Sequence, residues 1–478
     1  MSNKCDYFAS FFDVLAVMSR QPTPLFPPSF VWGTATSAYQ IEGAVAEGGR
    51  GPSIWDEFCD RPAMIAGGET GRVAADHYHR WPADVDLMAR LGLDSYRLSL
   101  SWSRILPTGS GPVNPEGVDF YERLLDRLCA VGISPAVTLF HWDLPSALQD
   151  QGGWMNRDTA YRLGEYAQVV GERLGDRVGM WMPINEPVVH TLYGYALGVH
   201  APGLALGFEA FQAAHHQLLG HGLAVQALRS AGCDNIGIAS NHAPVHAASD
   251  SPADVLAADV YDHVVNWMFA DPILLGKYPA EELAQLVSGP LDADLKIIST
   301  PLDWYGINYY EPTVIAAPVE GQGTAGVLEV DLPPGLPFAP VPMTGYPTTD
   351  FGWPVVPEAL GEILRTFKTR FGAALPPIYI TESGSSWHDL PDEFGEFVDR
   401  ARIDYHDAHL RAVRSAMDDG VDVRGYFVWS LLDNFEWAAG YKERFGLVHV
   451  DFQTQERTPK ASFEWYRALI AKHRAARV

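Results

Sequence analysis

The sequence predicts an α/β protein built as a single (β/α)8 TIM barrel with long βα loops at the C-terminal face. Three observations indicate this fold. Eight short apolar runs recur along the chain, amphipathic stretches lie between them, and polar or aromatic side chains stand at the ends of most runs. The 478 residues, 47% of them hydrophobic, suit one large barrel with insertions, because such barrels exceed the usual size of a domain.

The eight apolar runs are rich in β-branched and aromatic residues, as expected of strands that are buried on both faces. In chain order we expect strands at residues 31–38, 95–102, 134–141, 178–186, 236–241, 304–310, 378–382 and 425–431.

The intervening stretches show the spacing of outer helices. Residues 117–131, 357–371 and 399–417 each place apolar side chains on one stripe, which would pack against the sheet. The pair His215-His216 is expected on a helix surface. Residues 312–354 are rich in Pro, Gly and Thr and follow the sixth run, so they predict a long loop beside the C-terminal face.

The charge and the cysteines exclude several classes of protein. Acidic residues outnumber basic ones by 59 to 34, for a formal charge of −25, and this disfavours nucleic acid as a partner. No stretch is long and apolar enough to span a membrane. The four cysteines form no CxxC pair, so we expect no structural zinc and interpret them as reduced thiols of a cytoplasmic protein. They are Cys5, Cys59, Cys129 and Cys233.

The domain organisation is expected to be simple. Residues 1–25 predict a partly disordered N-terminal extension, and residues 26–478 predict the single catalytic (β/α)8 domain. Neither a metal nor an organic cofactor is expected, because the histidines and carboxylates show no metal-ligand spacing. The oligomeric state stays open.

Functional groups in such barrels stand at the C-terminal ends of the strands. Amide, imidazole, carboxylate and indole groups gather there in this chain. Planar hydrogen-bonding groups and aromatic faces are what a sugar ring requires. The residues are Gln40 and Glu42 after the first run, Arg97 in the second, His141 and Trp142 after the third, Asn185 and Glu186 after the fourth, Asn308, Tyr309 and Tyr310 in the sixth, Glu382 at the seventh, and Trp429, Glu436 and Trp437 after the eighth.

Two carboxylates end strands that would face each other across the barrel mouth. Glu186 ends the fourth run and Glu382 ends the seventh. Glycoside hydrolysis needs one carboxyl group as an acid and a second as a nucleophile or base. A gap of about 5–5.5 Å between the two groups would indicate retention of anomeric configuration.

Four long motifs carry a family resemblance. Residues 30–44 read FVWGTATSAYQIEGA, residues 95–102 read SYRLSLSW, residues 139–145 read LFHWDLP and residues 429–437 read WSLLDNFEW. They resemble glycoside hydrolase family 1, the β-glucosidase family, and the resemblance extends from about Phe26 to Leu469.

The resemblance implies a role for each matching residue. Glu186 matches the acid/base and Glu382 the nucleophile, with Arg97 and Tyr310 as the groups that orient Glu382. Asn308 matches a supporting position behind the site. Trp429 matches the platform under the sugar, whereas Asn241 and Trp353 match the aglycone side. The residues that match contacts to the sugar's hydroxyls are Gln40, His141, Asn185, Glu436 and Trp437.

The activity implied is that of a retaining β-glucosidase acting on small-molecule β-glucosides or cello-oligosaccharides, with β-galactosides and β-fucosides also open. The alternatives are a 6-phospho-β-glycosidase and a non-catalytic sugar-binding relative. Glu436 stands against the first because a carboxylate repels phosphate, and the presence of both glutamates stands against the second. Two positions depart from the family pattern: Pro183 replaces a Thr, and Ser383 replaces an Asn, which predicts altered support around Glu382.

Overall fold

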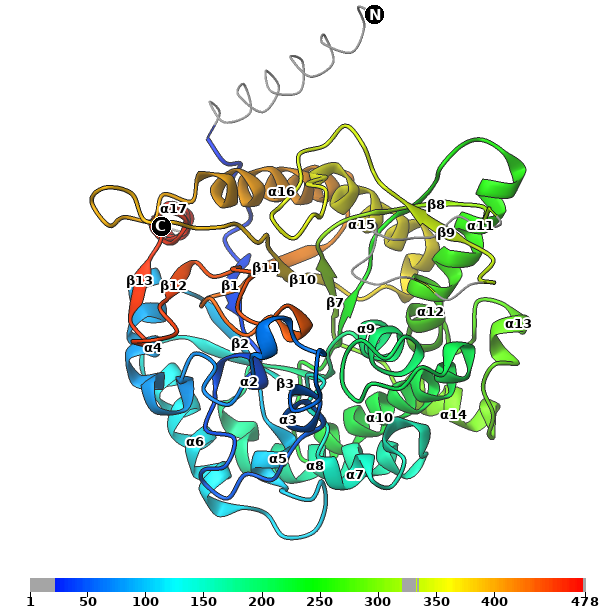
Figure 1. The fold of residues 1–478 in the computed structure, drawn as a ribbon, viewed down its shortest axis with the longest axis horizontal. Helices are drawn as coiled ribbons and strands as arrows, with labels where there is room; N and C mark the ends of the chain where they lie inside the picture. The colour runs from blue at the N-terminus through cyan, green and yellow to red at the C-terminus, as the bar shows by residue number, and fades with distance from the viewer. Residues whose placement is uncertain (1–21, 320–331, 333–334, 476–478) are drawn as a thin grey trace, which may run out of the picture.

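The computed structural model describes residues 22–319, 332 and 335–475, and it confirms the predicted barrel (Figure 1). Eight parallel strands form one sheet in the order β4-β3-β2-β1-β11-β10-β7-β5. The strands are β1 (Val31–Ala35), β2 (Ser95–Ser99), β3 (Ser134–Phe140), β4 (Met180–Ile184), β5 (Ala239–Asn241), β7 (Tyr305–Tyr309), β10 (Ile378–Ser383) and β11 (Val423–Trp429). Each of the eight predicted runs contains or overlaps one of them.

The two ends of this sheet meet at a weaker seam. Only the isolated bridges Trp181↔Ile236 and Asn185↔Ala239 join β4 to β5 among the described residues. Between these bridges β4 advances four residues while β5 advances three, so β4 carries a bulge that includes Pro183. Proline lacks an N–H and is tolerated in sheets mainly at edges and bulges. The seam therefore accommodates the unusual Pro183 without losing a regular ladder bond.

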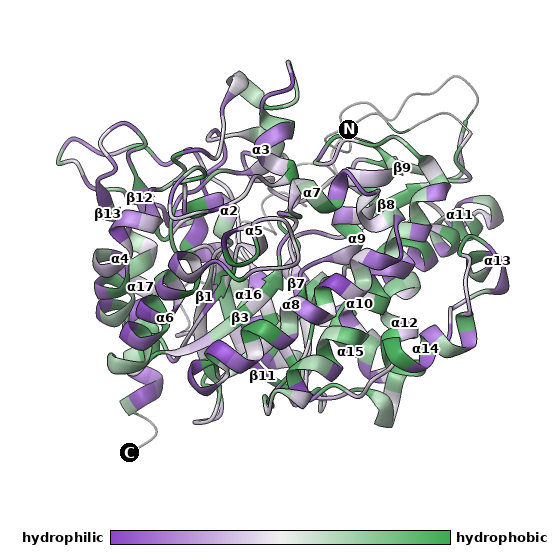
Figure 2. Cartoon of the chain, turned by 90° about the horizontal axis from the view of Figure 1, so that it is seen from below, coloured by the Kyte–Doolittle hydropathy of each residue, from purple (hydrophilic) through white to green (hydrophobic). Residues whose placement is uncertain are grey.

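Helices surround the strands (Figure 1), and the outer ones carry both hydrophobic and hydrophilic residues (Figure 2). Predicted helix 357–371 coincides with α15, and predicted helices 117–131 and 399–417 match α6 and α16 to within two residues. The α-helices are α2 (Ala38–Ile41), α3 (Ile54–Cys59), α4 (His77–Leu91), α5 (Trp102–Ile105), α6 (Pro115–Ala130), α7 (Ser146–Gln149), α8 (Asp158–Leu174), α9 (Pro187–Val189), α10 (Phe211–Ser230), α11 (Pro252–Asp262), α12 (Met268–Leu275), α13 (Glu281–Ala284), α14 (Leu291–Ile298), α15 (Pro357–Phe371), α16 (Arg400–Asp418) and α17 (Ala461–Ala475).

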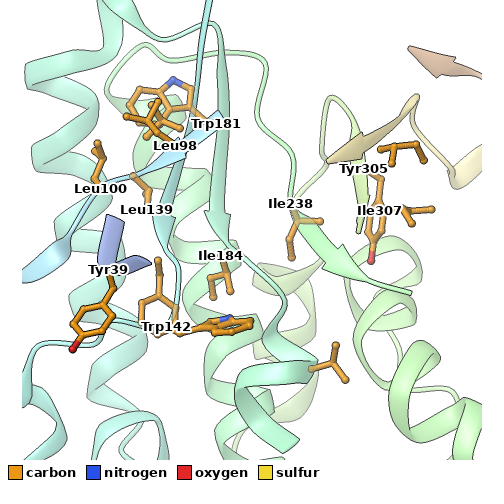
Figure 3. Packing of buried hydrophobic residues seen from close by; sticks show 14 of the residues in the cluster. Tyr39, Leu98, Leu100, Leu139, Trp142, Trp181, Ile184, Ile238, Tyr305 and Ile307 are labelled. Carbon is orange, nitrogen blue, oxygen red and sulfur yellow. The ribbon is translucent and has the colours of Figure 1, made fainter. Parts of the chain in front are cut away.

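Hydrophobic side chains fill both sides of the barrel wall. Residues that point outward, such as Leu98, Leu139 and Trp181, pack against the helices (Figure 3). A smaller cluster alternates with them along the strands and so fills the interior, as in other closed barrels. Its buried members are Ala35, Ala136, Met180, Met182, Ala239, Trp304, Phe427, Trp429 and Phe445.

The expectation that His215 and His216 lie on a helix surface is wrong. Both side chains are buried in α10, and His215 contacts the Tyr278 hydroxyl at 2.7 Å and Asp294 of α14 at 3.0 Å. The reason is that α10 packs against both α8 and α14. The helix α14 therefore covers the face of α10 that carries His215, a face that the sequence pattern alone predicts to be exposed to solvent.

The long loop predicted at residues 312–354 contains strands of its own. β8 (Thr313–Ala316) pairs in parallel with β6 (Val245–Ala247) and antiparallel with β9 (Ala339–Val341). Residues 320–331 and 333–334 lie outside the described part of the chain. A further hairpin joins β12 (Val448–Val450) to β13 (Arg457–Pro459).

The structure describes only the last residues of the expected N-terminal extension, residues 22–25. Most of the expected extension, including Cys5, lies outside the described residues. The Thr23 hydroxyl donates to Asp407 of α16, so the chain is in contact with the barrel from Thr23 or earlier.

Cys59, Cys129 and Cys233 are free thiols. Within the described ranges, no helix is long and apolar enough to cross a membrane.

A buried network of charges fastens α16 to the chain around it. The guanidinium of Arg402 is fully buried and contacts Asp389 at 2.8 Å as well as Asp399. Asp399 also accepts from the backbone N–H and hydroxyl of Ser462 at the start of α17. Lys460 contacts the same Asp389 and reaches Asp433, in the loop after β11, at 2.8 Å.

Removing the arginine should destabilise the fold strongly. Arg402→Leu leaves the buried carboxylate of Asp399 without its cation and leaves Asp389 with Lys460 alone, so we expect the free energy of unfolding to fall by about 3–5 kcal/mol. Arg400→Leu is the matched control, because Arg400 is 61% exposed and pairs with Asp404 along the helix surface; its loss should stay below about 1 kcal/mol. Urea unfolding checks both, and equal losses would contradict the role of the network.

Candidate active site

A cavity of about 220 Å³ opens at the C-terminal ends of the barrel strands. Nine of the predicted site residues line it. The other four, Gln40, Arg97, Asn185 and Asn308, lie buried behind this lining. The nine that line the cavity are His141, Glu186, Asn241, Tyr310, Trp353, Glu382, Trp429, Glu436 and Trp437.

Glu382 lies near the end of β10 with two hydrogen-bond donors on its carboxylate. Arg97, from β2, forms a buried ion pair with one oxygen. The hydroxyl of Tyr310 donates to the other oxygen at 2.7 Å. Burial, and then the charge of Glu382, raise the pKa of Tyr310, so the phenol keeps its proton. Charge-assisted bonds of this kind favour the ionised form of a carboxyl group.

Glu186 follows β4 and begins the short helix α9. Its carboxyl accepts a hydrogen bond from Asn308 Nδ2 at 2.8 Å. Burial raises the pKa of Glu186 to about 8, and the nearby charge of Glu382 adds to this effect. Burial thus favours the protonated form of Glu186, whereas Arg97 and Tyr310 favour the ionised form of Glu382, which is the arrangement that acid and nucleophile roles require.

Two amides couple the carboxyl groups. Asn185 Oδ1 accepts from Arg97 at 2.6 Å and from Asn308 at 3.0 Å. Asn308 Oδ1 in turn accepts from the hydroxyl of Thr381, beside Glu382, at 2.6 Å. The resemblance implied that Asn308 supports the site from behind, and in the structure its amide contacts Glu186 from a position behind the cavity lining. A continuous hydrogen-bonded chain thus links the two glutamates.

The imidazole of His141 is oriented by the same network. Asn185 Nδ2 lies 3.1 Å from His141 Nε2, and because the amide nitrogen is a donor, Nε2 accepts. Burial, together with the charge of Arg97, holds the pKa of His141 well below its usual range, so the ring is neutral and Nδ1 carries the proton. Nδ1 has no protein partner within the described chain. It can donate to a hydroxyl group of a ligand.

The cavity wall next to His141 combines carboxylate and indole groups. Gln40 Nε2 donates to the Phe435 carbonyl at 3.0 Å and lies 3.3 Å from Glu436 Oε2. This contact connects α2, which follows the first strand, with the loop after the eighth strand. The rings of His141 and Trp429 stack at 6.0 Å, with an angle of 22° between their planes. Carboxylate, amide, imidazole and indole therefore surround one end of the cavity.

The two residues expected on the aglycone side also line the cavity. Trp353 packs against Tyr310 with ring centroids 5.4 Å apart. Asn241 lies close enough to Glu186 to lower the pKa of this carboxyl group, against the dominant effect of burial. Ser383 lies in β10 beside Glu382, with its hydroxyl 3.3 Å from that of Tyr405 on α16, so its side chain supports the strand from outside.

Several cavity residues received no specific role in the sequence analysis, although Trp142 was among the groups expected at the strand ends. Trp142 lines the cavity and donates from its indole nitrogen to the Asn185 carbonyl at 3.0 Å. Its position directly after His141 was the available signal. Phe445 contacts Tyr310 and Trp353, but it lies in an irregular loop where no pattern identifies it. No group of three or more metal-ligating side chains occurs in the described ranges.

Comparisons with known proteins agree with this geometry. The family model for glycosyl hydrolase family 1 matches residues 23–475. The chain belongs to glycosyl hydrolase family 1. It is 42% identical over 452 residues to beta-glucosidase A of Acetivibrio thermocellus, covering 93% of this chain and 98% of the relative. It is 43% identical over 467 residues to the bifunctional beta-D-glucosidase/beta-D-fucosidase of Bifidobacterium breve, covering 95% and 100%.

A solved family 1 structure shows the same fold. The beta-glucosidase of Thermotoga maritima in complex with deoxynojirimycin superimposes with a TM-score of 0.88 at 40% identity, covering 94% of this chain and 99% of that chain.

The pKa of Glu186 provides a direct test of the site. We expect its carboxyl group to titrate near pH 8, as burial and the Glu382 charge dictate. In Glu382→Gln the negative charge is gone, so the pKa of Glu186 should fall, and NMR of 13C-labelled glutamate measures it. Glu443→Gln is the control, since Glu443 is also buried but bonds to Ser386 instead. An unchanged pKa in Glu382→Gln would contradict the proposed coupling.

Proposed function

We propose that this family 1 enzyme is a retaining β-glucosidase that removes terminal non-reducing β-D-glucosyl residues. The observation that carries the proposal is the pair of glutamates in one cavity, one held ionised by Arg97 and Tyr310 and the other kept protonated by burial. Double displacement requires two carboxyl groups in these states, one as the acid and one as the nucleophile.

Glu382 acts as the nucleophile. Its carboxylate oxygen attacks the anomeric carbon while the bond from that carbon to the leaving oxygen breaks, and the proton of Glu186 passes to the leaving oxygen. A covalent glycosyl ester of Glu382 results. Glu186, now ionised, takes a proton from water as the water oxygen attacks the anomeric carbon and releases Glu382. Two inversions at one carbon give net retention.

The cavity supports a neutral sugar at its inner end. His141 Nδ1, Gln40 and Glu436 provide donors and acceptors for hydroxyl groups, and Trp429 offers an aromatic face. Substrates would be β-glucosides or cello-oligosaccharides, with Asn241 and Trp353 beside the leaving group. The two free thiols that are buried, Cys59 and Cys233, support a reducing, cytoplasmic location as part of the proposal.

The nucleophile can be tested by chemical rescue. Glu382→Ala should reduce turnover of nitrophenyl β-glucoside by more than about 10³-fold, because no other group can form the ester. Azide should restore activity by occupying the space of the carboxylate, and NMR should identify α-glucosyl azide. Glu443→Gln should keep most of its activity. Substantial activity in Glu382→Ala without azide, together with no rescue, would contradict the assignment.

The sugar specificity can be tested with a panel of nitrophenyl glycosides. We expect kcat/KM to be highest for the β-glucoside, with turnover of the β-fucoside and β-galactoside, and to be negligible for the 6-phospho-β-glucoside. The Glu436 carboxylate in the cavity repels a phosphate group. Turnover of the phosphorylated substrate alone would favour the 6-phospho-β-glycosidase, and sugar binding without any turnover would favour a non-catalytic relative.

A further inference from the structure

Trp437 holds a backbone conformation that its own side chain disfavours. Its φ angle is +48°, in the left-handed region that bulky residues rarely adopt. Such a conformation persists only where the surroundings enforce it. Trp437 lines the sugar end of the cavity, and under the proposed function it contacts hydroxyl groups of the glucosyl ring.

Aromatic rings enclose Trp437. The ring of Trp142, which also lines the cavity, lies 4.7 Å from it. Trp55 lies 4.5 Å away, and Tyr39 stacks on it at 6.2 Å with an angle of 7° between the planes. Trp55 is fully buried and is absent from the described residues that line the cavity. It therefore contacts Trp437 from behind and cannot reach a sugar.

Trp55 also contacts the ring of His200, a second cavity residue, at 5.4 Å. Its indole nitrogen makes no hydrogen bond within the described chain. A buried N–H without a partner is unfavourable. Packing is consequently the contribution that this side chain makes, and the rings that it packs against belong to the cavity wall.

The helix that carries Trp55 is firmly anchored. A capping box between Ser53 and Asp56 begins α3, and Arg50 contacts Asp56 at 2.8 Å. The backbone N–H of Ile54 donates to the Leu144 carbonyl at 2.9 Å, in the segment that follows His141 and Trp142. The backbone beside Trp55 is thus hydrogen-bonded to the loop after β3, while its ring packs against Trp437 in the loop after β11.

We propose that Trp55 is a positioning residue that fixes the orientation of Trp437 and so sets the affinity for the glycone. This role rests on the proposed function, because it assumes that the cavity binds a glucosyl ring. The residue acts through Trp437 and does not touch the leaving group. Its effect is therefore the same for every aglycone.

The test compares Trp55→Phe with the wild-type enzyme. The Ki of deoxynojirimycin, and KM for both methyl and nitrophenyl β-glucoside, should rise by about tenfold, with kcat changed by less than about threefold. Trp154→Phe is the matched control, since Trp154 is equally buried, also lacks a partner for its indole nitrogen and packs on Phe140 away from the cavity. It should lose thermal stability without a change in Ki.

A double-mutant cycle with Trp437→Phe separates positioning from general packing. If Trp55 acts through Trp437, the two changes should raise Ki by much less together than the product of their separate effects. Additive effects, or a Trp55→Phe enzyme with the Ki of the wild type, would overturn the role of Trp55 while leaving the β-glucosidase intact. A wild-type protein without glucosidase activity would overturn both. Trp55→Tyr provides the same readouts if Trp55→Phe does not fold.

Discussion

The buried ion pair between Arg97 and Glu382 is the interaction on which the active site depends. A buried carboxylate at the C-terminal end of a barrel strand is unfavourable unless a cation and further donors compensate the lost hydration. Arg97 provides the cation, and its second nitrogen holds Asn185 at 2.6 Å. Asn185 in turn hydrogen-bonds to His141 and Asn308. The orientation of these polar groups around the cavity therefore depends on the charge of Arg97.

The barrel makes this network possible because it brings distant parts of the chain to one rim. Arg97 comes from β2, Asn185 and Glu186 follow β4, Asn308 comes from β7 and Glu382 from β10. Parallel strands present all their C-terminal ends on the same side. The packed apolar interior beneath them excludes water, which strengthens the ion pair and raises the pKa of Glu186 at the same time.

Much of this arrangement is predictable from sequence, for physical reasons. Doubly buried strands need uninterrupted apolar runs, so all eight could be located, and a polar residue that ends such a run stands out, as Glu186 and Glu382 do. Burial caused by a second layer of chain leaves no local pattern, which is why His215 was misplaced. Phe445 reaches the cavity from an irregular loop, and the pairing of β6 with β8 joins segments far apart in the chain; neither has a periodic signal.

The causes of the raised pKa of Glu186 explain how one residue can serve as acid and then as base. Burial is the larger cause and persists throughout a catalytic cycle, whereas the charge of Glu382 disappears when that carboxylate becomes an ester. The pKa of Glu186 must then fall in the covalent intermediate, at the moment when the group has to accept a proton from water. Burial thus keeps the pKa of Glu186 high throughout the cycle, and the loss or return of the Glu382 charge lowers or raises it from there. The hydrogen bond from Asn308 and the nearby amide of Asn241 oppose the effect of burial on the pKa of Glu186, so they keep the ionised form accessible without abolishing the acid.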